Sequence, residues 1–446
     1  MRPVSPTSGM NNNFEPINDQ TCGWVHTTTA APISPCLEED KQADWVIIGA
    51  GFTGLAAAYR IAELRPDDSI ILLDAEQAGK GASSRNSGYI VDITLNDGGA
   101  TLADEQIQLA KNKLNRAGMD LLRTRVEEFD IQCDWDESGK FHCAADKRNI
   151  PKLKNFEGFL DRAGLDYQVW SGQALSKRLG TDYYQHAVQT KSGVLVNPAG
   201  LINGLIKNLP TSVQLYENSP VLGIQRGNVT GLTTPKATVT ADRVIIAVNA
   251  LMPKNGFKRN RVFPLTLTAS MTRQLTDEEY LSIGKPEPWG VLSASSMGAT
   301  VRFTNDRRVM VRNTVEWWPG LAMNANELDI RRQRNFQGLR KRFPTLTNLD
   351  FEYSWSGNVC ISRNSKPVFE RDGDNFYLAG CYNAGGIAMG SLFGKLIVDH
   401  ALDQSSDELT QVLGQDKPTR LPPRPLFDIG LQTRLAFNRY QGRFEA

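Results

Sequence analysis

A glycine-rich turn near the start of the chain constrains the fold more than any other feature. Gly49, Gly51 and Gly54 form a G-x-G-x-x-G motif that lies between a predicted strand and a predicted helix. The elements predicted here are a strand, a helix and a second strand, at 44–48, 55–64 and 69–74. This order predicts a parallel sheet with a right-handed crossover.

The motif predicts a dinucleotide-binding site. The first glycine allows the tight turn, the second lets the backbone approach a pyrophosphate, and the third lets the helix pack closely on the strand. The helix start offers free N–H groups to the anion. Asp74 follows Gly54 by 20 residues, where it can accept hydrogen bonds from a ribose. The alternative is that the glycines only turn the chain and that Asp74 caps a loop. The motif alone does not distinguish NAD from FAD.

The rest of the chain alternates between two kinds of pattern. We expect mostly helix with a short hairpin around Gly139 in 101–185, with the core candidates Leu109, Leu114, Leu121 and Leu122, and strands in 210–250. Antiparallel strands are expected in 260–320, including a hairpin that turns at Asn305-Asp306. The later predicted elements are a charged helix at 325–342 and, at 375–402, a strand, a glycine-rich turn and a long helix. Two discontinuous domains follow from this alternation.

Composition narrows the function classes. The chain has 446 residues and a net charge of +1, so its whole-molecule charge gives no reason to bind nucleic acid, and a small-molecule partner is expected. The six cysteines are too few and scattered for a disulfide framework and are expected to be reduced. No signal peptide and no run of about 20 apolar residues is visible, which favours a cytoplasmic protein without integral membrane association. No metal site is expected.

A second glycine- and serine-rich stretch runs from Gly79 to Gly88. Its small residues and backbone donors suit a second pyrophosphate or flavin contact, although a flexible surface loop would have the same composition. The stretch resembles the G-A-S-x-R-N-x-G segment of the D-amino-acid-oxidase superfamily, in particular the branch that contains gamma-glutamylputrescine oxidase, and is similar to sarcosine oxidase-like amine oxidases.

The resemblance extends from about Asp44 to His400. It includes the segments 193–198, 241–250, 356–367 and 378–386, together with Val221. It implies FAD as cofactor and an antiparallel substrate domain that covers the flavin. The residues that the motif and the resemblance place at the cofactor are Gly49, Gly51, Phe52, Thr53, Gly54, Asp74, Ala75, Gly81, Ala82, Ser83, Ser84, Arg85, Asn86, Ser87, Val221, Asn249, Gly357, Cys360, Gly380, Gly385, Gly386 and Ile387.

We therefore predict an α/β (α+β) two-domain fold, with a Rossmann-like FAD-binding domain and a discontinuous antiparallel-sheet substrate domain. The predicted parts are a lead-in at 1–40, the FAD-binding domain at 41–100, 186–255 and 355–402, the substrate domain at 101–185 and 256–354, and a C-terminal tail at 403–446. The tail is expected to hold a helix packed on its own domain, with contact to a membrane surface as the alternative.

Four residues are candidates for a role in catalysis. The turn with Gly385 and Gly386 opens a helix, and its N–H groups could stabilise the N1/C2=O edge of a reduced flavin. The alternative is a plain helix start. Arg302 and Arg312 lie on the predicted hairpin, where either guanidinium could clamp a carboxylate, with a solvated edge-strand arginine as the alternative. The four histidines fall outside the matched motifs and are assigned no role.

The sequence also departs from its relatives. Many have a histidine where this chain has Gly385, sarcosine oxidases place a lysine near Ala388, and no lysine occurs in 263–272. In sarcosine oxidases a cysteine in a closing segment is bonded to the flavin. In the gamma-glutamylputrescine oxidase branch, an aliphatic residue resembles position 360. A non-covalent flavin is therefore expected, with a bond to Cys360 as the alternative.

The resemblance implies an FAD-dependent oxidoreductase that oxidises the C–N bond of an amine or amino acid to an imine by hydride transfer to flavin. A polyamine derivative or a secondary amino acid is the expected substrate, and oxygen or a quinone the expected electron acceptor. The alternatives are a D-amino-acid dehydrogenase that reduces a quinone and a non-catalytic flavoprotein subunit of a larger oxidase.

Overall fold

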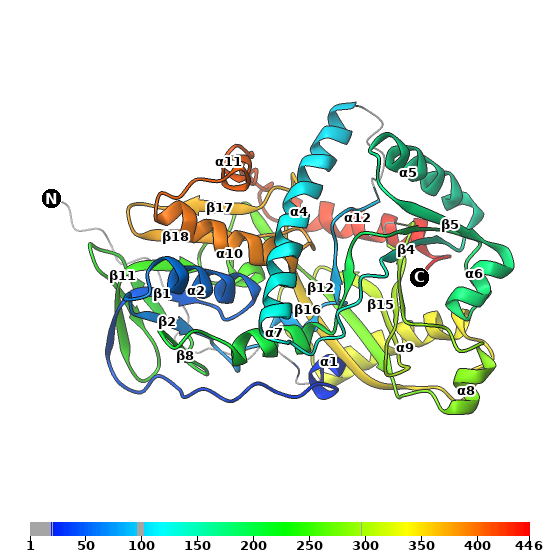
Figure 1. Ribbon diagram of the computed structural model, residues 1–446, viewed down its shortest axis with the longest axis horizontal. Helices are drawn as coiled ribbons and strands as arrows, with labels where there is room; N and C mark the ends of the chain where they lie inside the picture. Colours follow the sequence, from blue (N-terminus) through cyan, green and yellow to red (C-terminus); the bar gives the residue numbers. More distant parts are fainter. Residues whose placement is uncertain (1–18, 20, 96–101, 296) are drawn as a thin grey trace.

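The computed structural model describes residues 19, 21–95, 102–295 and 297–446. Residues 1–18 and 20 of the predicted lead-in, and the expected boundary between residues 100 and 101, lie outside these ranges. Figure 1 shows two sheets side by side. The long helix α4 (Leu102–Glu128) runs down the middle of this view. The fold is a mixed α/β fold of two domains.

The first sheet is the predicted nucleotide-binding sheet. Its order is β17-β18-β11-β1-β2-β8, with β10 pairing with β11 and β9 pairing with β10. The pairs β18·β11, β11·β1, β1·β2 and β2·β8 are parallel. The strands are β1 (Lys41–Ile48), β2 (Ile70–Leu73), β8 (Val213–Tyr216), β9 (Gly223–Gln225), β10 (Thr230–Thr233), β11 (Thr238–Ile246), β17 (Val368–Arg371) and β18 (Phe376–Gly380). The predicted order of strand, helix and strand is confirmed.

The second sheet has the order β16-β12-β15-β14-β13-β4-β6-β5 and is antiparallel except where β13 pairs with β4. The expected hairpin is present, because β14 and β15 pair antiparallel and the Thr304 N–H donates to the Arg308 carbonyl. The strands are β4 (Lys140–Ala144), β5 (Tyr167–Ser171), β6 (His186–Thr190), β12 (Val262–Thr272), β13 (Trp289–Ser293), β14 (Thr300–Phe303), β15 (Val309–Glu316) and β16 (Phe351–Ser362). Both β6 and β16 belong to this sheet, so it includes residues beyond the expected boundaries at 186 and 355.

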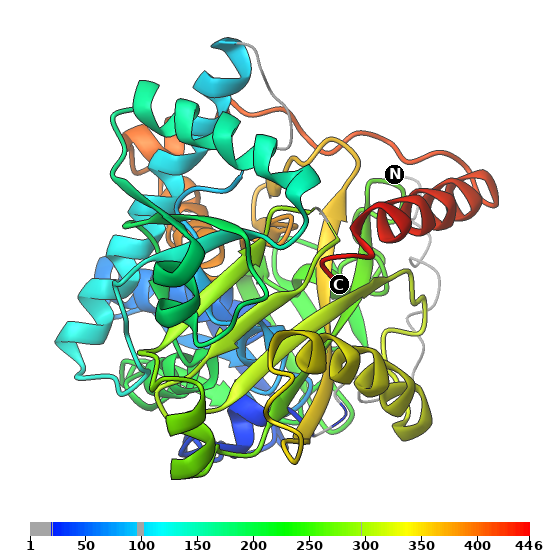
Figure 2. The same ribbon diagram turned by 90° about the vertical axis from the view of Figure 1, so that its right-hand side faces the viewer.

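The remaining elements connect or cover the two sheets. The short strands β3 (Tyr89–Ile90) and β7 (Val194–Leu195) pair with each other. The other helices are α1 (Gly23–His26), α2 (Phe52–Leu64), α3 (Ala82–Arg85), α5 (Ile150–Arg162), α6 (Gly172–Leu179), α7 (Pro198–Lys207), α8 (Asp277–Ser282), α9 (Ala325–Arg342), α10 (Ala388–Ala401), α11 (Asp407–Leu413) and α12 (Leu426–Gly442), with the 3-10 turns η1 (Lys147–Asn149) and η2 (Asn249–Leu251). Figure 2 shows the second sheet from the side on which α9 and α12 lie. Within the described ranges, no helix is long and apolar enough to cross a membrane.

Two details of the prediction for 101–185 were wrong. The hairpin around Gly139 does not form, because β4 pairs with the distant strand β6 instead. Gly139 allows β4 and β6 to pair closely. Its φ is +84°, and an added Cβ would lie 2.0 Å from the Thr190 carbonyl oxygen. Leu109 was expected in the core but is 38% exposed, whereas Leu114 and Leu122 of the same helix are buried.

Helices α2 and α10 meet at glycines on one face of the first sheet. An added Cβ at Gly394 would lie 2.1 Å from the Thr53 carbonyl oxygen, so the two backbones touch. Gly54 allows a similar approach of α2 to the preceding turn, where a Cβ would lie 1.9 Å from the Gly49 carbonyl oxygen. The start of α2 is therefore fixed relative to both β1 and α10.

We predict that Gly394→Ala lowers the free energy of unfolding by about 1–3 kcal/mol, because the added methyl group forces α2 and α10 apart. Thermal unfolding of the apoprotein measures this. Gly430→Ala in α12 is the matched control, since nothing lies within 4 Å of its Cβ position and helix propensity favours alanine. Equal melting temperatures for Gly394→Ala and the unmodified protein would contradict the backbone contact.

Candidate active site

The turn between β1 and α2 leaves space for an anion next to the helix start. Gly49 has a φ of +104°, and Gly51 caps α2 without any side-chain hydrogen bond. An added Cβ at Gly51 would lie 2.8 Å from the Ser83 hydroxyl oxygen. That oxygen accepts a hydrogen bond of 3.2 Å from the Phe52 N–H. The Ser83 hydroxyl thus accepts from the first N–H of α2, beside the glycine-rich helix start that suits an anion.

The second predicted segment, from Gly81 to Ser87, lies directly against this turn. It forms the short helix α3, which Gly81 caps, again without a side-chain hydrogen bond. Asn86 closes the segment, because its side chain donates to the Ser83 carbonyl at 2.6 Å and accepts from the Gly88 N–H at 2.8 Å. The contact between Ser83 and α2 brings together two segments that the sequence separates by about 30 residues.

Asp74 ends β2 beside the same turn. Its carboxylate accepts hydrogen bonds from the Ala50 N–H at 2.9 Å and the Glu76 N–H at 3.0 Å. Burial raises the pKa of Asp74 to about 6, although these N–H groups favour the ionised form. The Asp74 carbonyl accepts from the Ser219 N–H at 2.9 Å, so the segment leading to Val221 lies next to Asp74 and Ala75.

These groups fit FAD. The start of α2, where the N-cap Gly51 has no side chain, and the glycine cradle around it suit a pyrophosphate, and Asp74, which is partly exposed as a residue, has acceptor capacity left for a ribose. Asn249 and Gly380 extend the site toward the ends of β11 and β18. The Asn249 side-chain oxygen accepts from the Cys381 N–H at 2.9 Å, and an added Cβ at Gly380 would lie 3.3 Å from the Asn249 Cα atom.

The glycine-rich turn before α10 has a strained backbone. Cys381, Asn383 and Ala384 all have φ values between +50° and +75°. The Gly385 N–H donates to the Tyr382 carbonyl at 3.0 Å, whereas no group in the described part of the chain accepts from the Gly386 N–H. The helix itself begins at Ala388, slightly later than predicted, with Ile387 as its N-cap.

Tyr382 connects this turn to the nucleotide-binding turn. Its hydroxyl is 2.7 Å from the Thr53 hydroxyl, and both side chains are buried. Together with the glycine contact between α2 and α10, this bond places Gly385 and Gly386 on the same side of the sheet as the pyrophosphate cradle.

The lead-in supplies a buried ion pair that the sequence did not reveal. Asp19 pairs with Arg85 of α3, and its carboxylate also accepts from the Ser356 N–H at 2.8 Å. Burial alone would raise the pKa of Asp19, but Arg85 and these hydrogen bonds hold it below its usual value. Arg85 in turn donates to the Ser356 carbonyl at 2.6 Å. The pair joins α3 to β16 and brings Gly357 within 3.6 Å of the Arg85 carbonyl oxygen, measured from an added Cβ.

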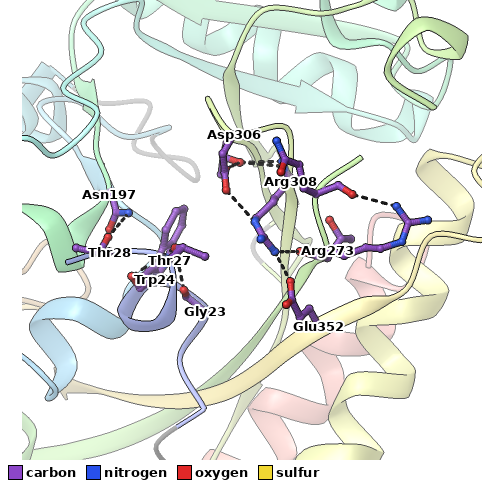
Figure 3. A network of polar contacts seen from close by, with 12 residues as sticks. Gly23, Trp24, Thr27, Thr28, Asn197, Arg273, Asp306, Arg308 and Glu352 are labelled. Carbon is purple, nitrogen blue, oxygen red and sulfur yellow. Dashed lines mark hydrogen bonds and ion pairs between the residues drawn. The ribbon is translucent and has the colours of Figure 1, made fainter. Parts of the chain in front are cut away.

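Trp24 of α1 is a second residue that sequence reasoning missed. It is buried, and its indole N–H has no hydrogen-bond partner among the described residues. Figure 3 shows α1 beside the hydrogen bond from Asn197 to Thr28, which has a length of 2.7 Å. The only signal in the sequence is a tryptophan within an otherwise polar lead-in.

Arg302 and Arg312 lie on the same face of the second sheet, because Arg302 pairs with Met310 and Thr300 pairs with Arg312 across β14 and β15. Arg302 is held by backbone carbonyls through its Nη1 atom, while its buried Nε has no hydrogen-bond partner among the described residues. Its Nη1 donates to the Ser87, Gly88 and Val196 carbonyls at 3.0–3.2 Å. Its guanidinium also lies 5.6 Å from the ring centres of both Trp24 and Tyr89.

Arg312 differs from Arg302 in its hydrogen bonding. Its Nη2 donates to the Thr300 hydroxyl, and no acidic side chain of the described ranges forms an ion pair with it. Burial lowers the pKa of Arg312 to about 10, and Tyr89 is the polar neighbour that opposes this shift. Arg312 therefore combines partial burial with an unneutralised charge.

Cys360 lies in β16 opposite Pro264 and is buried among apolar side chains that include Met252 and Val262. A hydrogen bond with Cys381 and burial raise the pKa of the Cys360 thiol well above its usual value. A protonated thiol is a poor nucleophile. All six cysteines are free.

The fold and the site define a flavin-dependent oxidoreductase with a Rossmann-like nucleotide domain. The model of the DAO family, described as FAD dependent oxidoreductase, matches residues 44–400, and the chain belongs to this family. Gamma-glutamylputrescine oxidoreductase of Escherichia coli is 26% identical over 81% of this chain and 84% of its own length. A probable oxidoreductase, OrdL, of Haemophilus influenzae is 25% identical over 92% of this chain and 94% of its own length.

Solved structures share the fold. Glycine oxidase from Geobacillus kaustophilus superposes with a TM-score of 0.67 at 19% identity, over 82% of this chain and 96% of that protein. L-proline dehydrogenase from P. horikoshii superposes with a TM-score of 0.64 at 16% identity, over 85% of this chain and all of that protein.

We predict that Gly51→Val abolishes FAD binding, because a branched side chain would fill the space between the Ser83 hydroxyl and the helix start. Asp74→Ala should weaken binding by about tenfold, since it removes ribose hydrogen bonds and the acceptor of the Ala50 N–H but leaves the glycines of the cradle in place. Flavin content and the FAD dissociation constant of the purified variants measure both effects. Stoichiometric flavin in Gly51→Val would refute the assignment of this turn.

We predict a non-covalent flavin, because the Cys360 thiol is buried, apolar in its surroundings and protonated. Acid precipitation should leave the yellow colour in the supernatant, both for the unmodified protein and for Cys360→Ala. Colour that stays with the pellet and is lost in Cys360→Ala would show a covalent bond.

Proposed function

We propose that this enzyme oxidises the C–N bond of an amine that also carries a carboxylate, and that Arg312 binds this carboxylate. The observation that carries the proposal is the partly buried guanidinium of Arg312, which donates to the Thr300 hydroxyl and forms no ion pair with an acidic side chain of the described residues. A buried cation without a partner is costly, and a bidentate carboxylate is the ligand that best repays the cost.

Three comparisons support an amine substrate with this chemistry. The matching family is that of FAD-dependent oxidoreductases, and two of the solved structures with the same fold are named for glycine and L-proline, both of which carry a carboxylate next to an amine. In addition to these two structures, one relative by sequence is named for gamma-glutamylputrescine, a conjugate of an amino acid with a polyamine. A secondary amino acid or a polyamine conjugate that retains a free carboxylate fits all three.

When bound, FAD supplies the hydride acceptor for oxidation of the amine to an imine. The residues of the chain bind and orient the substrate. Arg312 holds the carboxylate, while Arg302 is a positioning residue that ties β14 to Ser87 and Gly88. The Gly386 N–H, with the start of α10 behind it, is the donor that we assign to the reduced ring, and Gly385 shapes the turn that presents it. Trp24 and Tyr89 exclude water beside Arg302.

The electron acceptor in this proposal is oxygen or a quinone. Neither β12 nor β16 contains a lysine that could stabilise reduced oxygen species. Oxygen consumption and quinone reduction, measured with the same reduced enzyme, separate the two acceptors. We place the reaction in the cytoplasm, which agrees with six free thiols.

We predict that Arg312→Lys raises the KM of a carboxylate-bearing amine by about tenfold or more, because a point charge does not reproduce the planar guanidinium fork and a charged hydrogen bond contributes about 1.5–3 kcal/mol. The turnover number should change less, since the lost interaction is present before and during the reaction. Steady-state kinetics measure both constants.

Arg302→Lys is the matched control. It should lower the melting temperature and the flavin content, because three backbone carbonyls lose their donor, while leaving KM within about twofold for the fraction that retains flavin. Unchanged kinetics in Arg312→Lys, or a large KM effect in Arg302→Lys alone, would remove Arg312 from the proposal.

A further inference from the structure

The C-terminal helix α12 packs on the second sheet through one of its faces. Phe427 and Leu435 contact this sheet, and the Phe427 ring centre lies 5.0 Å from that of Phe263 and 5.8 Å from that of Trp317. Leu431 joins the same cluster. This confirms a helix packed on its own domain, but it accounts for only one side of α12.

The opposite side of α12 is also apolar. Leu426, Ile429, Phe437 and Tyr440 are 58–67% exposed, and Phe444 just beyond the helix is 48% exposed. Their spacings of three, four or eight residues align them on one stripe at about 3.6 residues per turn. We call these five residues the outer stripe. In Figure 2, α12, drawn in red, lies at the edge of the molecule.

Arginines flank the outer stripe on both sides. On the helix, Arg434 follows one edge of the stripe, and Arg439 and Arg443 follow the other. Arg443 stacks on the rings of Tyr440 and Phe444, with its guanidinium 3.9 and 4.3 Å from the ring centres. The edges of the stripe are therefore positively charged.

Acidic groups cancel only part of this charge: Arg424 lies 3.8 Å from Asp428, and Arg439 lies 4.0 Å from Glu316, which also pairs with Arg331. Within 420–446 there are five arginines, two acidic side chains and the terminal carboxylate. Of the acids, Glu445 is buried and accepts hydrogen bonds from the Ala145 and Asp146 N–H groups at 3.1 Å. The exposed face of this segment is accordingly cationic, although the whole chain has a net charge of only +1.

We propose that the outer stripe of α12 docks the enzyme on an anionic lipid surface. An apolar stripe between arginines matches an interfacial helix, in which the apolar side chains enter the membrane boundary and the arginines meet lipid phosphates. A second copy of the chain is the competing occupant. If two copies met through the outer stripe, the flanking arginines of both copies would lie close together and repel each other. The charge pattern therefore favours lipid.

Vesicle co-sedimentation of the full-length holoenzyme tests the proposal. The protein should sediment with vesicles of phosphatidylglycerol mixed with phosphatidylcholine, bind phosphatidylcholine alone far more weakly, and dissociate as salt is raised. The double variant Ile429→Ser with Phe437→Ser should reduce binding by on the order of tenfold or more, because two exposed apolar anchors are lost. Arg434→Gln with Arg443→Gln should reduce both the binding and its dependence on salt.

The matched control is Leu281→Ser with Ile330→Ser, which removes two side chains of similar exposure, 62% and 54%, from other helices. This control should bind as the unmodified protein does, and all variants should retain flavin and turnover. Failure of the unmodified protein to bind anionic vesicles, or equal loss in the control, would overturn the proposal. So would a change from dimer to monomer in sedimentation equilibrium caused by the stripe variant, which would identify a second copy as the occupant.

Discussion

Where α2 crosses α10, glycines take the place of side chains and the two backbones touch. The Cβ position of Gly394 in α10 lies 2.1 Å from the Thr53 carbonyl oxygen in α2, and that of Gly54 lies 1.9 Å from the Gly49 carbonyl oxygen in the preceding turn, so α2 is held against both α10 and the end of β1. One end of the arrangement is the anion-binding start of α2, and the other is the turn at Gly385 and Gly386. A single packing constraint therefore sets the distance between the pyrophosphate cradle and the donors assigned to the flavin ring.

The second sheet is attached to this unit through buried charge. Arg85 of α3 pairs with Asp19 and donates to β16, and Arg302 of β14 donates to three carbonyls around Gly88 and Val196. Arg85 meets the charged partner Asp19, whereas Arg302 relies on backbone carbonyls and leaves its buried Nε without a partner among the described residues. Arg312 lies on the same face with a hydrogen bond to the Thr300 hydroxyl in place of backbone carbonyls, and this contrast is why we propose it as the group that binds a substrate.

Much of the nucleotide-binding half could be predicted because its signals are local. The glycines, the apolar strands and Asp74 occur within 30 residues, and charge and periodicity alone located α9 at its observed bounds. The links between distant segments could not be predicted. Gly139 was read as a turn, whereas it permits close pairing with β6, and nothing in the polar lead-in indicated that Asp19 is buried against Arg85. Local patterns do not specify which remote partner a residue meets.

The most direct test of this account is anaerobic mixing of the holoenzyme with paired amines that differ only in a carboxylate, such as a secondary amino acid and its decarboxylated analogue. Loss of the oxidised flavin absorbance reports transfer of the hydride. The account predicts that a carboxylate-bearing amine bleaches the flavin rapidly and that its decarboxylated partner does so at least about tenfold more slowly at equal concentration. Equal bleaching by both members of every pair would contradict a substrate held by Arg312, and a flavin that no amine in a broad panel reduces would contradict C–N oxidation itself.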